Sequence, residues 1–114
     1  MDVLIERDGD VVVATPIAEH LDLSNADSFR YEIISALGDC HKLVLDLERV
    51  EFVDSRGCGA IISCLKHVSV AGGDLKLCGV KPGVRSVLEL IRLHRICEIL
   101  ETRDQALYSF ESLT

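Results

Sequence analysis

A serine with charged neighbours stands where a strand pattern gives way to a helix pattern, in Asp54-Ser55-Arg56-Gly57. Before it, the apolar run Leu43-Val44-Leu45 is typical of a strand that is buried on both faces. After it, apolar residues recur at helical spacing from Cys58 to Val68, so we expect a helix to begin close to Ser55. The Ser55 hydroxyl would then lie among free backbone N–H groups, at the positive end of the helix dipole.

Two interpretations of Ser55 remain open from the residues alone. Serine is a preferred helix N-cap, and a cap contributes about 1 kcal/mol to stability. The same hydroxyl, exposed at a turn, is also within reach of a protein kinase. A phosphate there would suit the helix N-terminus, with Asp54 repelling it and Arg56 offsetting that repulsion.

Several other residues have both a structural and a functional interpretation. Asp22 and Asp54 are either solvated loop charges or groups that contact a partner. Ser24 is the expected N-cap of the helix that follows it, with Asp27 as its capping-box partner. Gly57, together with the next glycine along the helix, is expected to let the helix approach the sheet closely.

Composition restricts the class of protein. The 114 residues suit one domain, and we expect residues 1–114 to form it. No stretch is apolar enough to cross a bilayer, and no secretory signal is evident, so a cytoplasmic protein is expected. A net charge of −7 argues against a nucleic-acid partner. Five scattered cysteines without a C-x-x-C motif favour free thiols in a reducing compartment.

Metal and catalytic sites are not favoured. Cys64-x-x-His67 and His94-x-x-Cys97 have the spacing of zinc ligands, but both cysteines also fit apolar positions, so we expect no metal or cofactor. Ser55 lacks the G-x-S-x-G context of a nucleophile elbow and has no histidine placed to activate it. The sequence also lacks the acidic pair and the lysine of a phospho-aspartate receiver. We therefore expect a binding module that is not an enzyme.

The element pattern predicts an α/β domain with an N-terminal hairpin. Asp8-Gly9 between two β-rich runs is a strong hairpin signal, and Pro16 is expected to end the second strand or to place it on an edge. Helix and strand patterns then alternate, which predicts parallel strands joined by right-handed crossovers. The expected result is a mixed sheet of four to five strands layered with about four helices. The later elements are a helix stripe of Phe29, Ile33 and Leu37 ended by Gly38; a strand at Leu75–Cys78 after Gly72-Gly73; a helix that starts at Pro82 and buries Val84, Val87, Leu88 and Ile91; a strand at Ile96–Leu100; and a last helix, capped at Thr102–Gln105, that buries Ala106, Leu107 and Phe110.

Two segments carry a family resemblance: L-D-L-S-N-A after the second expected strand and V-L-D-L-E-R-V-E-F-V-D-S-R-G-C-G after the third. The chain resembles the STAS family over nearly its whole length, and within it the bacterial anti-sigma factor antagonists. The resemblance implies that Ser55 is phosphorylated by a partner serine kinase, which is also the anti-sigma factor, and that Asp22 belongs to the recognition surface. Arg56 stands where the family commonly has a small hydroxyl residue, and Cys58 where it has leucine. Arg56 would pair with a phosphate on Ser55 or change which kinase fits.

The leading hypothesis is an anti-sigma factor antagonist that phosphorylation at Ser55 switches off, and so a regulator of sigma-factor-dependent transcription. Its expected partner surface contains Asp22, Ser24, Asp54, Arg56 and Gly57. One alternative is a STAS scaffold or accessory subunit of a signalling or transport complex, without a switch. A second alternative is a nucleotide or small-ligand sensor. The identity of the kinase and sigma factor, a phosphatase partner and the oligomeric state stay open at this point.

Overall fold

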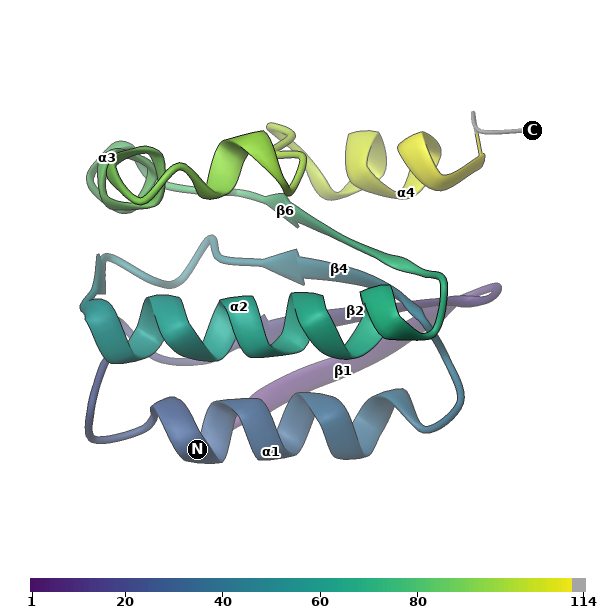
Figure 1. The fold of residues 1–114 in the computed structure, drawn as a ribbon, viewed down its shortest axis with the longest axis horizontal. Coiled ribbons are helices and arrows are strands. Elements are labelled where there is room, and N and C mark those ends of the chain that lie inside the picture. The colour runs from purple at the N-terminus through teal and green to yellow at the C-terminus, as the bar shows by residue number, and fades with distance from the viewer. Residues whose placement is uncertain (112–114) are drawn as a thin grey trace.

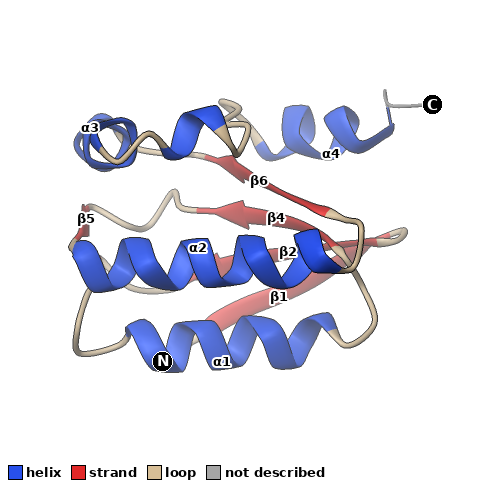
Figure 2. Ribbon diagram, in the orientation of Figure 1, coloured by secondary structure: helices blue, strands red, loops and turns tan. Residues whose placement is uncertain are grey.

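The structure, a computed structural model, describes residues 1–111. Its elements are β1 (Val3–Asp8), β2 (Val11–Pro16), β3 (His20–Leu21), α1 (Ala26–Leu37), β4 (Lys42–Asp46), β5 (Phe52–Val53), α2 (Ser55–Val70), β6 (Asp74–Cys78), α3 (Pro82–Leu90), the 3₁₀ turn η1 (Leu93–Arg95) and α4 (Arg103–Glu111). Figure 1 shows how these elements are layered, and Figure 2 separates helices from strands by colour. The α/β class that the sequence predicts is confirmed.

The main sheet has four strands in the order β1-β2-β4-β6. β1 and β2 pair antiparallel as a hairpin, and β4 lies parallel to both β2 and β6. This is the mixed sheet that the sequence predicts. β2 ends at Pro16, at the last residue of the strand, where its missing N–H interrupts no further pairing.

The hairpin turn differs by one position from its sequence signal. Asp8 pairs with Val11, so Gly9 and Asp10 are the two central residues of the turn. Gly9 has φ 61°, which fits the glycine at the first central position of a type II′ turn. Asp8 is the last residue of β1, because Gly9 alone supplies the positive φ that the turn needs.

Alternate residues of the strands face two different helix layers. Leu43 and Leu45 of β4 face the main core, which α1, α2 and α3 complete, while Val44 faces a smaller core under α4. α1 and α2 run side by side in Figure 1, with α2 drawn across β2, and α4 lies beyond β6 at the other side of the picture. Because both faces are covered, the central strands read as continuous apolar runs, as the sequence analysis expected.

The helix stripes of the sequence analysis are largely confirmed. Phe29, Ile33 and Leu37 are buried on α1, and Gly38 ends that helix with φ 54°. α3 starts at Pro82 as its first residue and buries Val84 and Leu88, while α4 buries Ala106 and Phe110. Ile91 is an exception: it lies one residue beyond α3 and is 43% exposed, because the chain turns there into η1.

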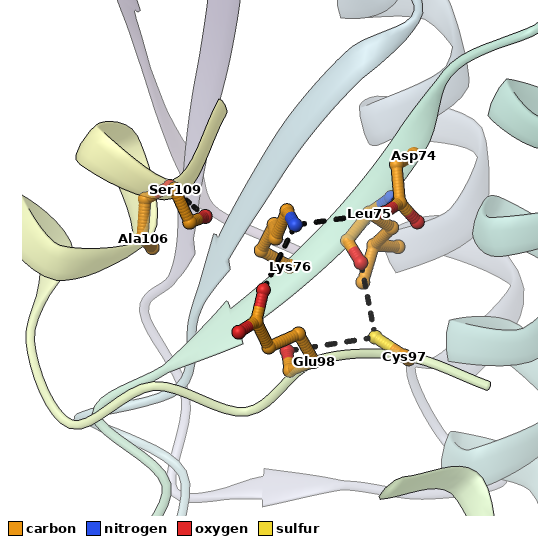
Figure 3. A network of polar contacts seen from close by, with 7 residues as sticks. All are labelled: Asp74, Leu75, Lys76, Cys97, Glu98, Ala106 and Ser109. Carbon is orange, nitrogen blue, oxygen red and sulfur yellow. Dashed lines mark hydrogen bonds and ion pairs between the residues drawn. The ribbon is translucent and has the colours of Figure 1, made fainter. Parts of the chain in front are cut away.

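The expected strand at Ile96–Leu100 is wrong, since only one bridge forms, parallel, between Leu77 and Ile99. The Cys97 thiol donates to the carbonyl of Leu75 at 3.1 Å, where a longer ladder would place a backbone N–H. Figure 3 shows this contact beside β6. The segment therefore lies against the sheet edge without extending it as a strand.

A buried lysine joins this segment to β6 and α4. The Lys76 side chain is 7% exposed and forms ion pairs with Glu98 at 2.9 Å and Asp74 at 3.7 Å. Figure 3 shows the ammonium group between these two carboxylates. The ammonium also lies 5.2 Å from the centre of the Phe110 ring, and this cation–π contact further stabilises the buried charge.

Arg103, the first residue of α4, fixes the other end of that helix. Its guanidinium pairs with Glu6 of β1 and with Asp46 of β4, and it donates to the hydroxyl of Thr15 at 3.2 Å. Three strands are therefore linked to α4 through one side chain. Among residues 1–111, no helix combines the length and apolar composition that crossing a membrane requires.

Candidate functional site

A short second sheet brings two distant segments of the chain together beside Ser55. β3 and β5 pair parallel, with His20 opposite Phe52 and Leu21 opposite Val53. The Asp54 amide then donates to the carbonyl of Leu21 at 3.2 Å. The sequence analysis predicted no strand at either segment, because strands of two residues are too short to show an alternating pattern.

Asp54, and not Ser55, caps helix α2. One carboxylate oxygen of Asp54 accepts from the backbone N–H of Gly57 at 2.9 Å, which is the N-cap bond. The other oxygen accepts from the N–H of Leu23 at 3.2 Å. The expected capping role of Ser55 is wrong, because Asp54 has the extended backbone of an N-cap and Ser55 is already the first helical residue. Asp54 thus connects the loop between β3 and α1 (residues 22–25, the Asp22 loop) to the start of α2.

Gly57 is buried where the first turn of α2 meets β3. A Cβ placed on Gly57 would lie 2.1 Å from the carbonyl oxygen of Leu21, which is far inside van der Waals contact. Only glycine therefore allows this close approach. Gly59 is different: it is exposed and a Cβ there would meet nothing within 4 Å, so the close-packing role expected for it is wrong.

The Asp22 loop is held by its own side chains. One Asp22 oxygen accepts from the Ser24 amide at 2.9 Å and from the Ser24 hydroxyl at 2.6 Å. The Asn25 side chain accepts from the Asp22 amide at 2.9 Å and donates to the carbonyl of His20 at 2.8 Å. The hydrogen bonds from Ser24 lower the pKa of Asp22, so its carboxylate is charged at neutral pH.

The expected capping box of Ser24 and Asp27 is wrong. Ser24 donates to Asp22 instead of accepting from the helix, and α1 begins at Ala26 with Asn25 in the N-cap position. The Asn25 side chain makes no cap bond of its own, because it is used within the loop. Ser24 therefore stabilises the loop that carries Asp22.

Ser55 and Arg56 are exposed, and Ser55 opens onto a hollow of about 240 Å³ between α1 and α2. The residues that line this hollow are Ala26, Asp27, Arg30, Ser55, Arg56, Gly59, Ala60 and Ser63. Arg30 is a residue that the sequence analysis missed. Only the packing of α1 beside α2, which Figure 1 shows, brings it to the same hollow as Ser55.

Two large apolar side chains are exposed on the segments that form the site. Leu23 follows Asp22 and is 68% exposed, and Phe52 of β5 is 50% exposed. The ring of Phe52 contacts that of His20 edge to face, with centroids 5.9 Å apart. The sequence analysis missed both residues as contact candidates, because an apolar residue in a sequence is first interpreted as core.

Four of the expected contact residues carry polar or charged side chains: Asp22, Ser24, Asp54 and Arg56. The structure places them with Ser55 on the β3 loop and the start of α2, while Gly57 lies underneath. Within residues 1–111, no group of three or more His, Cys, Asp or Glu side chains is arranged to hold a metal ion. The arrangement offers an exposed serine with charged and apolar neighbours on the β3 loop and the first turn of α2.

The comparisons with known proteins agree with this fold. The STAS domain family matches residues 2–106. An anti-sigma F factor antagonist of Paenibacillus polymyxa is 29% identical over 102 residues, covering 88% of this chain and 87% of that protein. A candidate anti-sigma factor antagonist of Thermotoga neapolitana is 35% identical over 100 residues, covering 86% of this chain and 88% of that protein.

A solved structure gives the same result. The crystal structure of a candidate anti-sigma factor antagonist from Thermotoga maritima superposes with a TM-score of 0.87 at 30% identity, covering 94% of this chain and 92% of that one. The match extends over the hairpin, the parallel strands and the helices that carry the site, since it leaves little of the chain uncovered. The chain therefore belongs to the STAS domain family, and its relatives there are anti-sigma factor antagonists.

Proposed function

We propose that this protein is an anti-sigma factor antagonist that binds an anti-sigma factor with serine kinase activity, and that phosphorylation of Ser55 ends this binding. The observation that carries the proposal is the exposed Ser55 hydroxyl at the first residue of α2, beside the Asp22 loop. The names of the relatives support an anti-sigma factor as the partner. The protein acts through contact and performs no catalysis itself.

The phosphorylation step belongs to the partner kinase. The Ser55 oxygen attacks the γ-phosphorus of ATP, and the bond between that phosphorus and the oxygen bridging to the β-phosphate breaks. The hydroxyl proton passes to a base of the kinase, and ADP leaves. The product carries about −1.5 to −2 charges at pH 7. A partner docked over Ser55 would have to bury this group, which is unfavourable without matched cations.

The docking surface consists of Asp22, Ser24, Leu23, Phe52 and Arg56, around Ser55. Leu23 and Phe52 supply apolar contact, and the charged residues supply orientation. Asp54 and Gly57 act from beneath this surface, because the first is committed to backbone hydrogen bonds and the second is buried. The role of these two residues is to position the loop and helix.

The test uses the kinase that co-purifies with the protein from its native cell. Incubation with that kinase and Mg-ATP should add one phosphate to the wild type and to Ser69→Ala, a control for another exposed serine of α2, but none to Ser55→Ala. Intact mass measures the gain. Phosphate incorporation into Ser55→Ala at the wild-type level would refute the assigned site.

Binding of the same kinase is measured by calorimetry. Ser55→Asp should bind more than about a hundredfold more weakly than the wild type, equivalent to roughly 3 kcal/mol. Equal affinities, together with no phosphate gain, would favour the alternative of a STAS scaffold without a switch. A measurable heat of binding when nucleotide is titrated into the protein without the kinase would favour the alternative of a nucleotide sensor.

A further inference from the structure

The hollow beside Ser55 contains two arginines from different helices. Arg30 comes from α1 and Arg56 from α2, and both line this hollow together with Ser55. Both side chains are exposed. Within the described residues neither forms an ion pair, whereas Lys76 and Arg103 on the opposite face of the sheet are each paired with carboxylates.

The groove between α1 and α2 is lined by further basic side chains. A second hollow of about 520 Å³ shares Arg30 and Ser63 with the first and adds Lys66 and His67. Asp27 is the acidic residue among the side chains that line these hollows, and it lines the first hollow only. A protein with a net charge of −7 thus presents unpaired guanidinium groups beside the one serine assigned to modification.

The start of α2 offers a phosphate at Ser55 fewer free donors than an uncapped helix would. The Gly57 N–H is already taken by the carboxylate of Asp54. That carboxylate and Asp27 also add negative charge around the serine. Side chains can add the missing counter-charge, and guanidinium groups match phosphate oxygens through paired N–H donors.

We propose that a phosphate on Ser55 is held in this hollow by Arg30 and Arg56, which bridge α1 and α2 across it. This inference rests on the proposed phosphorylation of Ser55. The phosphorylated protein then changes its surface in two ways: it gains a dianion, and it removes two guanidinium groups that the unmodified protein offers to a partner. The two arginines act as an internal anion site that is filled only after modification.

The test installs phosphoserine at position 55 by genetic encoding, so that no kinase is needed. Phosphorus NMR then follows the second ionisation of the phosphate with pH. In the otherwise wild-type chain its pKa should lie on the order of one pH unit below the ordinary value of about 6, because opposite charges nearby favour the dianion. Arg30→Gln and Arg56→Gln should each raise it, and the double variant should restore the ordinary value.

Lys66→Gln is the matched control, since it removes a cation from the same groove but lines only the far hollow. Its phosphate should ionise as in the wild type. The proposed phosphate site would be overturned if the phosphate pKa were equal in all variants. It would also be overturned if Lys66→Gln shifted this pKa as much as Arg30→Gln does. A third variant, Arg30→Lys, should give an intermediate pKa, because it keeps the charge and loses the paired donors.

This test is independent of the proposed function. If the kinase never modifies Ser55, the NMR titration still reports whether the arginines hold a phosphate there. If the arginine substitutions leave the titration unchanged while phosphorylation still abolishes partner binding, the proposed arginine site is wrong and the proposed function still holds.

Discussion

The carboxylate of Asp54 makes a separate contact with each oxygen, one to the Gly57 N–H and one to the Leu23 N–H. Loss of an N-cap of this kind costs about 1 kcal/mol in helix stability. The second bond has a different consequence, because it fixes the distance between the Asp22 loop and Ser55. At the scale of single residues, the site therefore depends as much on a capping group as on the serine itself.

Leu23 provides a test of the docking surface that leaves the core intact. Leu23→Ala should weaken binding to the partner kinase by at least fivefold, about 1 kcal/mol, because an exposed apolar side chain at a docking site is buried on binding. Calorimetry measures the affinity, and thermal unfolding should stay within a few tenths of a kcal/mol of wild type.

Tyr108 of α4 is the control for this variant, since it is 67% exposed on the opposite side of the sheet. Tyr108→Ala should bind the kinase as the wild type does. Equal loss of affinity in both variants would mean that the partner does not select the surface around Ser55.

At the scale of elements, periodicity predicted the helices and the main sheet, while the details near the site depended on contacts between distant segments. The helix stripe of α1 could be predicted from the spacing of Phe29, Ile33 and Leu37, but its start could not, because Ser24 bonds to Asp22 instead of to the helix. β3 and β5 were missed for a similar reason: each strand exists only through the other.

Ser55 shows how far the sequence could define the candidate site. Its place at the beginning of a helix could be predicted from local spacing, whereas Arg30 could reach the same hollow only after α1 packed beside α2. Local patterns thus predict where a side chain lies along its element. They do not predict which side chain of a neighbouring element faces it.

The two glycines of α2 form a matched pair for testing the packing of that helix on β3. Gly57→Ala should lower the free energy of unfolding by about 2 kcal/mol or more, because the new Cβ would press on the Leu21 carbonyl. Gly59→Ala should raise it by about 0.5–1 kcal/mol, because that position has open space and alanine favours a helix. Urea unfolding measures both. A loss of stability in both variants, or in neither, would contradict the structure.

At the scale of the whole molecule, the sheet separates two kinds of surface. The α4 face is fixed by paired charges, with Lys76 and Arg103 linking α4 and its flanking segment to the strands. On the α1–α2 face, Arg30 and Arg56 lie next to Ser55 and form no ion pair with any residue between 1 and 111. The proposed phosphorylation of Ser55 would therefore change the second face without disturbing the contacts of the first.

The buried thiols predict how the whole fold responds to alkali. Burial raises the pKa of Cys64, Cys78 and Cys97 to about 12, above the ordinary value of 9.0. The unfolded chain loses these protons first, so stability is fully present below about pH 9 and is lost as pH rises towards 12. Each thiol should contribute a slope on the order of 1.4 kcal/mol per pH unit in that range.

Urea unfolding at several alkaline pH values measures this slope. Cys78→Ala should reduce it by about one thiol's contribution, because other titrating groups are common to both proteins. Cys40→Ser keeps all four buried thiols and so controls for the loss of a cysteine as such. An unchanged slope in Cys78→Ala would show that this thiol ionises equally in both states.

The parallel pairing of His20–Leu21 with Phe52–Val53 has a consequence for how the proposed kinase would recognise Ser55. The serine and the loop beside it come from segments separated by about thirty positions, and no contiguous stretch of the chain reproduces them together. A short synthetic copy of residues 50–60 would present the hydroxyl without Asp22 or Leu23. A kinase that reads this surface must therefore read a shape and not a linear motif, and would discriminate the native protein from its own fragments.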